Sequence, residues 1–503
     1  MTGNIATRAI RVHDADNVAT AIADIAAGER LFADSTVRAS VDLGRGHKVA
    51  IEPIARGAAV IKYGFPIGTA TTDIAPGEHV HSHNLATALS GDGDYLYAPD
   101  AGEAAQPGKT APTFRGYVRP DGRVGTRNEI WILPTVGCVG NLAARVARIA
   151  GERHAGRVDG VHAFKHPFGC SQLGDDLGHT RALLAALAQH PNAGGVLIVG
   201  LGCESNQLGA LLDLIPAERR AHIRTLSAQA VEDDEEACLE SIDALVDGCA
   251  DTPRSDVPLS KLVLGVKCGG SDGFSGLSAN PALGHAADLL IQQGGTVVIT
   301  EVPEFCGAEH ILAHRAKDRA TGEAVYEMVD WYKVYASKFG SALGENPSPG
   351  NVAGGLLNIT IKSLGAIAKA GTTRVEGCCG YAEVPSGKGL WLMQGPGYDQ
   401  ESTPGLVAAG SQLVVFTTGR GTTIGNAIAP VVKLASNTAV HERMSRDLDL
   451  SAGGIIDGTD TIEDVGSRVV EHVIRVASGE VLAKAEESKH REFQIWAEQS
   501  VSL

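Results

Sequence analysis

From Phe114 onward, short apolar segments alternate with amphipathic segments, and this alternation limits the chain to a small set of folds. The first apolar–amphipathic pairs are IWILPTV with NLAARVARIAGER, VHAFKHP with TRALLAALAQH, and GGVLIVGLG with QLGALLDLI. Later apolar segments are KLVLGVK, TVVITEV, TTRVEG, LWLMQG and QLVVFTTG, with helical segments such as NPALGHAADLLIQQ among them. Because strands that are buried on both faces carry continuous apolar runs, the pattern predicts mainly parallel sheets covered by helices. The predicted fold class is therefore α/β.

Residues 1–99 have a different pattern, in which short apolar stretches alternate with turns. Six glycines between Gly44 and Gly77 interrupt these stretches. The pattern predicts a small, mostly β module with one early helix in IRVHDADNVATAIADI. Residues 100–113 are rich in Pro, Gly, Ala and Thr and have no periodicity, which is typical of a linker.

Two α/β domains are expected after this linker. The segment DTPRSDVPLS at residues 251–260 interrupts the alternation and predicts a boundary. We therefore expect a Rossmann-like domain at residues 114–255 and a second α/β domain at residues 256–503. The second domain contains TIEDVGSRVVEHVIRVASGEVLAKAEE, which predicts a long amphipathic helix broken near Gly479.

Charge and composition restrict the possible partners. The 503 residues carry a formal net charge of −16, which disfavours nucleic acid or an anionic membrane as a partner. A small anionic substrate is still compatible, because a local group of cations outweighs the global field. No apolar run reaches membrane-spanning length, and MTGNIATRAIRVHDADN lacks an apolar signal core. The nine cysteines therefore predict thiols or metal ligands in a cytoplasmic protein.

Five of the cysteines directly follow predicted strands: Cys138, Cys170, Cys203, Cys268 and Cys306. Ligands of open α/β sheets bind at the carboxyl ends of the strands. Any one of these cysteines also fits such a position as a small hydrophobic side chain. Their repetition favours a reactive or metal-binding edge over that structural explanation.

Histidines are concentrated in GEHVHSHN, which contains His79, His81 and His83. On an extended segment, side chains at i, i+2 and i+4 share one face, so two or three imidazoles can bind one divalent cation. His47 in RGHK is a candidate fourth participant. Spacing alone leaves open the alternative that these histidines are merely solvated.

Two glycine-rich loops after predicted strands suit an anion, because they expose backbone N–H groups and hydroxyls. KCGGSDGFSG contains Lys267 and Ser271, and VVFTTGRGTTIGN contains Arg420. Arg127 in GYVRPDGRVGTRNE lies nearest the first parallel strand and could bind a carboxylate, although a solvated hairpin is the alternative. Dinucleotide and P-loop spacings do not occur in these loops, so nucleotide binding is not supported.

Candidate proton-transfer groups also lie at predicted strand ends. Glu204, Glu301 and Glu304 could act as bases or as ligands near a cation, and His166 precedes Cys170 by four residues. Any single one of these groups is more often structural than catalytic. Their shared position raises the expectation of a catalytic site.

Longer motifs identify a resemblance. GHKVAIEPIARGAAVIKYGFPIG and DIAPGEHVHSHN resemble the N-terminal β-clip (SAF) module of the altronate and galactarate dehydratases. The remaining motifs that resemble this family, in order, are GYVRPDGRVGTRNEIWILPTVGCVGN, HPFGCSQLGDD, HPNAGGVLIVGLGCESNQ, CGGSDGFSGLSANP, TEVPEFCGAE, ENPSPGN, KSLGAIAKAG and FTTGRGT. The family also includes lyases that release sulfite from sulfolactate. In those relatives the β-clip module is often a separate chain, whereas fusion here favours a dehydratase.

The resemblance implies an iron(II)-dependent hydro-lyase acting on a small anionic sugar acid, an altronate-type hexonate or a galactarate-type hexarate. Such an enzyme removes the proton α to the carboxylate and releases the C3 hydroxyl, giving a 2-keto-3-deoxy acid. Another divalent cation or an iron–sulfur cluster is the alternative cofactor. Imidazoles suit a mononuclear ferrous ion, whereas three cysteinates suit a cluster with an open iron. A homodimer is the expected assembly.

The resemblance and the chemistry together give a set of expected site residues. The metal ligands are expected among His47, His81 and His83 or among Cys138, Cys170 and Cys203. Proton transfer is assigned to His166 and Glu301. The residues expected to bind the sugar acid are Lys62, Arg127, Lys267, Ser271 and Arg420.

Overall fold

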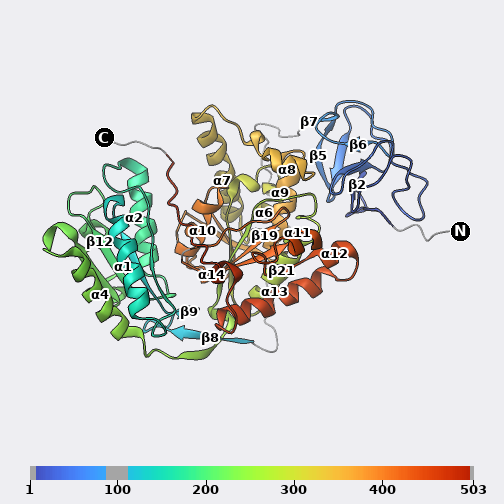
Figure 1. Cartoon of the computed structure of the whole chain (residues 1–503). Helices are drawn as coiled ribbons and strands as arrows, with labels where there is room; N and C mark the ends of the chain where they lie inside the picture. The colour runs from blue at the N-terminus through green and yellow to red at the C-terminus, as the bar shows by residue number, and fades with distance from the viewer. Residues whose placement is uncertain (1–6, 87–111, 427, 499–503) are drawn as a thin grey trace.

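The computed structural model describes residues 7–86, 112–426 and 428–498. Figure 1 shows a small β module, a central domain and a further domain beside it. The predicted α/β class with an N-terminal β-clip module is confirmed. The linker predicted at 100–113 lies outside the described residues as far as residue 111.

The β module contains two small sheets, with strand orders β1-β2-β3-β6 and β4-β5-β7. The strands are β1 (Ala9–Ile10), β2 (Val18–Ala21), β3 (Lys48–Ala50), β4 (Ala59–Lys62), β5 (Phe65–Ala70), β6 (His79–Val80) and β7 (Leu85–Ala86). The early helix predicted here is wrong, because its central residues form β2. All four residues of β2 are buried: Val18 faces the core shared with the central domain, and Ala19 and Ala21 face the module's own core.

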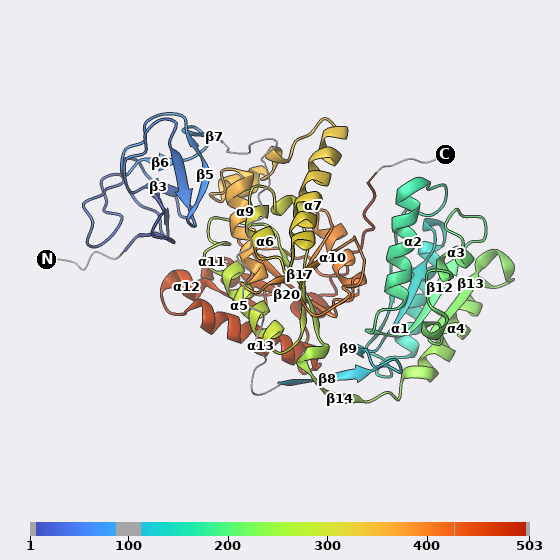
Figure 2. The same cartoon turned by 180° about the vertical axis from the view of Figure 1, so that it is seen from behind.

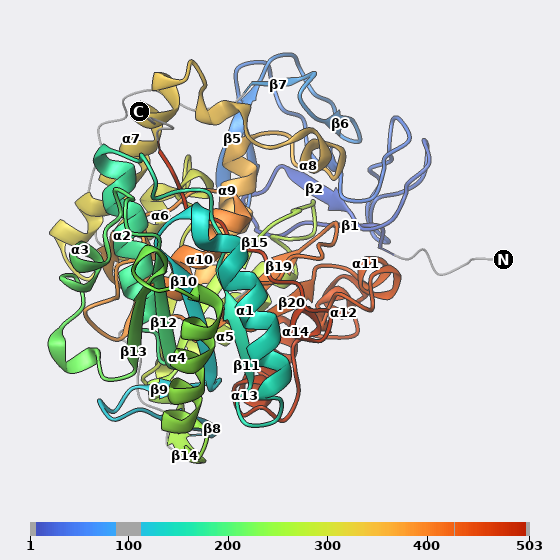
Figure 3. The ribbon, with the colours of Figure 1, turned by 60° about the vertical axis from the view of Figure 1, so that its left-hand side comes forward.

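The domain after the linker is a four-stranded parallel sheet of order β11-β10-β12-β13 with helices on both faces (Figure 3). Alternate residues of β10 point to opposite faces of the sheet and belong to two different hydrophobic cores. Ile130 and Ile132 contact one helical layer, while Trp131 and Leu133 contact the other. The elements are β10 (Glu129–Pro134), α1 (Gly140–Arg153), β11 (Gly160–Ala163), α2 (Gly174–Ala188), β12 (Ala193–Gly200), α3 (Leu208–Leu212), β13 (Ile223–Ser227) and α4 (Asp234–Cys249).

The central domain contains a seven-stranded parallel sheet of order β17-β18-β16-β15-β19-β20-β21. Its strands are β15 (Val263–Cys268), β16 (Thr296–Ile299), β17 (Val375–Cys379), β18 (Gly389–Met393), β19 (Leu413–Thr418), β20 (Val431–Ala435) and β21 (Leu450–Ser451). Its helices are α5 (Ala279–Gln292), α6 (Glu309–His314), α7 (Arg319–Lys338), α8 (Pro349–Ala353), α9 (Ile359–Ile367), α10 (Asp399–Ala408), α11 (Thr438–Arg443), α12 (Gly453–Asp457), α13 (Ile462–Ala477) and α14 (Lys484–Glu487).

The helix predicted near the C-terminus is divided as expected. Thr461 caps the start of α13 by accepting a hydrogen bond from the Asp464 N–H. Gly479 follows the end of α13 with a left-handed φ of 72°, a conformation that glycine adopts without strain. None of the helices in the described ranges is long and apolar enough to cross a membrane.

Two connections join the outer domain to the central domain. The first is an antiparallel sheet of β8 (Thr113–Val118), β9 (Val124–Gly125) and β14 (Arg254–Pro258), which lies along the base of both domains in Figure 2. The second is the segment after α14, which runs between the domains. There the Phe493 ring lies 5.4 Å from the Phe164 ring of the outer domain.

This second connection contains a carboxyl group with a shifted pKa. Glu401 on α10 accepts a hydrogen bond from Gln494, and burial raises the pKa of Glu401 to about 7. The unfolded glutamate ionises near pH ~4.3, so the native state loses relative stability as the pH rises from there to about 7. Glu401→Gln keeps an acceptor oxygen and removes this loss. We expect it to raise the apparent melting temperature by about 1 °C or more at pH 8, and by less at pH 5.

The control for this prediction is Glu480→Gln, because Glu480 is exposed and its partner Arg475 is 3.8 Å away. Melting curves of both variants at the two pH values make the comparison. An equal shift for Glu401→Gln at pH 5 and pH 8 would contradict the prediction.

Candidate active site

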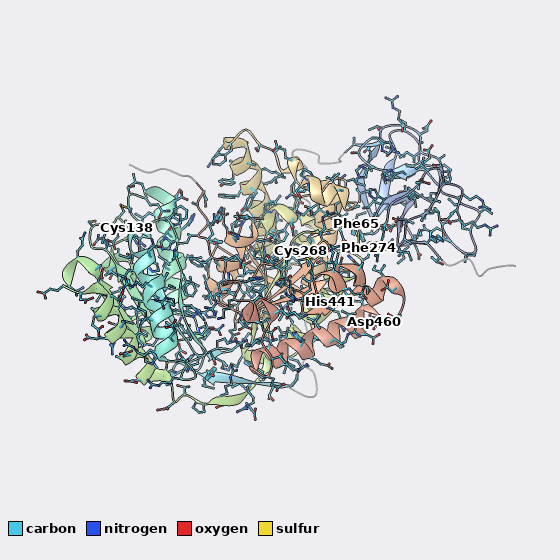
Figure 4. All side chains as sticks on the ribbon, in the orientation of Figure 1. Phe65, Cys138, Cys268, Phe274, His441 and Asp460 are labelled. Carbon is cyan, nitrogen blue, oxygen red and sulfur yellow. The ribbon has the colours of Figure 1, made fainter. Side chains whose placement is uncertain are left out.

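The β module packs against the carboxyl edge of the central sheet. The Arg45 guanidinium lies 4.7 Å from the ring centroid of Phe274, which follows β15 and faces the module (Figure 4). The two backbones approach closely, since a Cβ at Gly273 would lie 2.3 Å from the Gly46 carbonyl oxygen. The glycines of both motifs therefore allow the module to dock at this edge, where ligands of open α/β sheets bind.

A cavity of about 330 Å³ lies at this contact, within the size range of small-molecule sites. Its lining includes the guanidinium-bearing Arg45, Arg420 and Arg443 and a single carboxylate, Asp272. Arg420 follows β19, Arg443 ends α11, and Arg45 comes from the β module. Three cations against one anion give the cavity a local positive charge in a chain of net charge −16. Such a cavity suits a carboxylate-bearing ligand.

Asp272 is fixed at the wall of this cavity by its neighbours. Its carboxylate accepts hydrogen bonds from the Phe274 N–H (3.0 Å), from Ser436 (3.1 Å) and from Asn437 (3.2 Å). Burial raises the pKa of the Asp272 carboxyl group, against the effect of these donors. A buried carboxylate of raised pKa beside a substrate-sized cavity is a candidate proton acceptor.

A group of histidines lies next to the segment that contains Val352 and Ala353: His47 is hydrogen-bonded to the backbone of Ala353, which lines the cavity, and His81 to that of Val352. His47, His79 and His81 have ring centroids 5.1–5.6 Å apart, and His83 adds a ring 5.6 Å from His79. Nδ1 of His47 lies 3.0 Å from Nε2 of His79. Imidazoles bound to one ion at about 2.1 Å have nitrogens about 3 Å apart and centroids about 5 Å apart. The His47 and His79 nitrogens have this spacing, whereas the set of three ligand side chains within 4.8 Å of one another in the described ranges is Cys268 with Glu301 and Glu304 and does not include the three histidines.

The protonation states of these histidines also suit a metal. Burial lowers the pKa of His47 and His81, and together with the neighbouring histidines it lowers that of His79 to about 4. Neutral imidazole is the form that binds a metal. Nε2 of His81 is buried and has no hydrogen-bond partner, which is costly unless a ligand completes it. The neutral imidazoles therefore offer ligands to a divalent cation, and His47 and His79 already have the spacing of two ligands of one ion.

Lys62, at the end of β4, is buried inside the β module. Its ammonium group donates to the Thr20 hydroxyl (2.8 Å), and burial lowers its pKa to about 8. Lys48 is buried beside it and donates to the Gly355 carbonyl; burial and Lys62 together lower the pKa of Lys48. Both lysines are buried, and neither of them lines the cavity.

Lys267 and Glu301 belong to a buried ion cluster at the ends of β15 and β16. The Lys267 ammonium lies 2.7 Å from Glu301, and the Lys369 ammonium lies 3.0 Å from Glu301 and 2.9 Å from Glu304. Lys369 and Lys362 outweigh burial and lower the pKa of Glu304 to about 2. The side chains of Lys267 and Glu301 have no exposed surface and do not line the cavity.

The same cluster contains a possible metal-binding set. Cys268, Glu301 and Glu304 offer ligand atoms that all lie within 4.8 Å of one another. The Lys369 ammonium, however, contacts all three side chains at 2.9–3.0 Å. A cation therefore already occupies the centre of this set, which makes it a structural ion cluster.

The remaining expected residues are distributed over both α/β domains. The Ser271 carbonyl accepts a hydrogen bond from Asn351 behind the cavity wall. His166 is buried, and its ring nitrogens contact the Pro134 carbonyl (2.8 Å) and the Phe168 N–H (3.3 Å). Cys138, Cys170 and Cys203 are exposed on the outer domain, and Figure 4 shows Cys138 far from Cys268. Figure 1 shows the outer domain and the β module that carries the histidines on opposite sides of the central domain, so these cysteines and the histidines lie far apart.

Arg127 is enclosed between the two α/β domains. Its guanidinium forms two 2.8 Å bonds to Glu486 and donates to the carbonyls of Thr126 and Val476. Since these contacts use the donors that a substrate carboxylate would need, Arg127 acts as a structural connection between β9–β10 and the C-terminal helices.

Four residues at the site were not among the expected ones, Arg45, Asp272, Asn437 and Arg443, and His79 was a candidate that the expected ligand set left out. Arg45 and Asp272 lie inside motifs that the sequence singled out, RGHK and KCGGSDGFSG, and His79 lies in GEHVHSHN. Their local context gave no reason to choose them over their neighbours. Arg443 and Asn437 had no signal, because only the fold brings α11 to the cavity.

Three family models match the chain consecutively. The altronate/galactarate dehydratase SAF domain matches residues 7–88, and the D-galactarate dehydratase/altronate hydrolase second domain matches 116–250. The D-galactarate/altronate dehydratase C-terminal domain matches 259–501. The chain belongs to the altronate and galactarate dehydratase family. It is therefore a hydro-lyase of that family.

Individual relatives agree with this assignment. Altronate dehydratase of Bacillus subtilis is 42% identical over 97% of this chain and 98% of its own length. Altronate dehydratase of Escherichia coli is 42% identical over 93% of this chain and 95% of its own length. Galactarate dehydratase (L-threo-forming) of Escherichia coli is 34% identical over 93% of this chain and 92% of its own length. The chain is thus similar to both groups along most of its length.

The structural role of Arg127 gives a stability prediction. Arg127→Met leaves the Glu486 carboxylate partly buried without its partner, and we expect it to lower the free energy of unfolding by about 3 kcal/mol. Urea unfolding followed by circular dichroism measures this change. Arg148→Met is the control, because that exposed pair with Glu152 contributes about 0.5 kcal/mol or less. Unchanged stability with a raised KM would instead place Arg127 in substrate binding.

Proposed function

We propose that this protein dehydrates a sugar acid in the cavity between the β module and the central domain, with a divalent metal held by His47, His79 and His81. The single observation that carries the proposal is the convergence at one contact of three guanidinium groups, one buried carboxylate and three neutral imidazoles. The names of the relatives support a hexonate such as altronate or a hexarate such as galactarate as the substrate. Identity is higher to the altronate dehydratases, so an altronate-type hexonate is the first candidate.

The chemistry of the reaction requires this combination of groups. The proton α to a carboxylate is weakly acidic, and its removal creates a second negative charge beside the first. Arg45, Arg420 and Arg443 hold the carboxylate and offset that charge in a partly enclosed cavity. His47, His79 and His81 would hold the divalent cation, which would supply Lewis-acid stabilisation of negative charge on the substrate. The metal is expected to be iron(II), as the family resemblance implies.

Proton transfer is assigned to Asp272 in this proposal. Among the described residues that line the cavity it is the only one with a carboxylate, and its donors Ser436 and Asn437 hold it in one orientation. Its raised pKa makes it a stronger proton acceptor than an ordinary aspartate. The proton at C2 passes to this carboxylate, which returns it to the departing C3 hydroxyl as the C3–O bond breaks. Water leaves, and the enol that remains tautomerises to the 2-keto-3-deoxy acid.

Release of sulfite from sulfolactate is the alternative reaction within the family. The beta subunit of (2R)-sulfolactate sulfo-lyase from Chromohalobacter salexigens is 34% identical over 76% of this chain and 96% of its own length. Its alpha subunit is a separate chain that matches 15% of this chain at 38% identity. Here the equivalent module is fused and contributes Arg45 and the histidines from the same chain. Dehydration is therefore the reaction we propose.

The test of this function is a substrate comparison. The anaerobically purified enzyme with iron(II) is offered altronate, galactarate and sulfolactate, and 2-keto acid and sulfite are measured separately. We expect 2-keto acid from altronate, no sulfite, and loss of activity after treatment with a chelator that iron(II) restores. Sulfite release, or turnover that a chelator does not reduce, would contradict the proposal.

Asp272→Asn tests the assignment within the cavity. Removing a general base lowers kcat by about 100-fold or more, and we expect KM to change little. Arg420→Gln removes a cation from the wall and should instead raise KM. Arg224→Gln on the exposed part of β13 is the control and should change neither. Melting curves establish that all three variants are folded.

A further inference from the structure

Three loops of the outer domain bring Cys138, Cys170 and Cys203 to one place. The cysteines follow β10, β11 and β12, which are adjacent in the sheet order β11-β10-β12. Their loops are joined by backbone hydrogen bonds, from the Gly137 N–H to the Phe168 carbonyl (2.9 Å) and from the Ser205 N–H to the Cys170 carbonyl (2.8 Å). The carboxyl edge of the four-stranded sheet is thus built to hold three thiols together.

The packing of these loops leaves little freedom. Gly169 has a φ of 96°, and a Cβ there would lie 2.1 Å from the Thr135 carbonyl oxygen. Glu204, next to Cys203, accepts hydrogen bonds from the Thr135 hydroxyl (2.6 Å) and from the N–H groups of Leu201 (3.1 Å) and Gly202 (2.6 Å). Its oxygens therefore hold the loop in place and leave metal coordination to the thiols.

The three thiols are neighbours and differ from the other cysteines. The Cys138 thiol is hydrogen-bonded to Cys170 and, with Cys203 also contributing, raises the pKa of the Cys170 thiol. All three are exposed, whereas the other six cysteines are buried or half-buried. Exposed adjacent thiols are prone to oxidation. A bound metal centre would explain their arrangement.

A hollow of about 510 Å³ lies beside Cys138 and Cys170. Gly140 on its wall begins α1, a helix of 14 residues whose N-terminal N–H groups favour negative charge. Lys165 adds a cation. His166 lines the hollow, but both of its ring nitrogens contact the backbone, so the protein offers three ligands here and no fourth.

The ligand set favours a cluster over a single ion. Three exposed thiols come from three adjacent loops, and the ring nitrogens of His166, which lines the hollow, contact the backbone. Three cysteinates with one open position suit an iron–sulfur cluster with an open iron.

We infer that Cys138, Cys170 and Cys203 bind a [4Fe–4S] cluster whose fourth iron has no cysteine ligand and faces the hollow. The open iron is suited to an oxygen ligand such as a carboxylate or hydroxyl group. This centre lies on a different domain from the histidines and the cavity, and it goes beyond the proposed function. Its presence is measured independently of turnover.

The test is the content of iron and acid-labile sulfide in the full-length protein after anaerobic purification and reconstitution with iron and sulfide. We expect about four sulfides per chain, and an EPR signal of a three-iron cluster after brief oxidation, as the open iron is lost. Cys138→Ser, Cys170→Ser and Cys203→Ser should each remove most of the sulfide. Cys378→Ser, a half-buried cysteine of the central domain, should keep it.

The opposite results would overturn the inference. These are wild-type protein without acid-labile sulfide, stoichiometric zinc without sulfide, or sulfide that persists in the three serine variants. Circular dichroism shows whether each variant is folded. A mononuclear ion at the histidines contributes iron but no sulfide, so failure of this inference and failure of the proposed function give different results.

Discussion

The buried ion cluster at the ends of β15 and β16 is the constraint on which the rest of the site depends. Lys267, Lys362 and Lys369 face three carboxylates, those of Glu301, Glu304 and Asp399, so the charges balance. Removing one partner from such a group costs about 3–5 kcal/mol, because it leaves an unpaired charge in the core. The group joins two central strands to α9, to the turn after it and to α10.

This cluster supports the surface on which the β module docks. Glu301 has a left-handed φ of 72°, a conformation that a non-glycine residue keeps only when its surroundings hold it. Here the Glu301 carboxylate accepts hydrogen bonds from Lys267, Lys369 and the Cys268 N–H. Helix α9 is fixed from below by Lys362 and Lys369. From above, its cap Asn358 donates to the Ile67 carbonyl of the module (2.7 Å). The ion cluster and the β module are therefore both joined to α9, and the module also contributes Arg45 to the cavity wall.

Much of the architecture could be predicted from the sequence, because apolar runs and amphipathic runs follow different periods. That signal located the parallel strands, the helices and the break at Gly479. It failed at residues 18–21, where a short segment buried on both faces has no distinguishing period. The sequence also predicted that Cys138, Cys170 and Cys203 lie at one edge of the sheet, because the carboxyl ends of parallel strands all lie at the same edge.

The site itself could be predicted only in part. His47 and His81 lie in the histidine group, and Arg420 lines the cavity. Arg127, Lys267 and Glu301 have charges suited to a substrate, but their partners lie far along the chain and bury them. Arg45 and Arg443 meet across almost four hundred residues, a contact that no local pattern encodes.

The central claim is that the catalytic metal lies among the histidines, at the contact between the β module and the central domain. The most direct measurement is a crystal structure of the anaerobically purified, iron-loaded enzyme with data collected on both sides of the iron absorption edge. The account predicts an anomalous peak between His47, His79 and His81, beside the cavity lined by Asp272 and Arg420. A peak at Cys268, Glu301 and Glu304 in place of Lys369, or histidines without any peak, would contradict it.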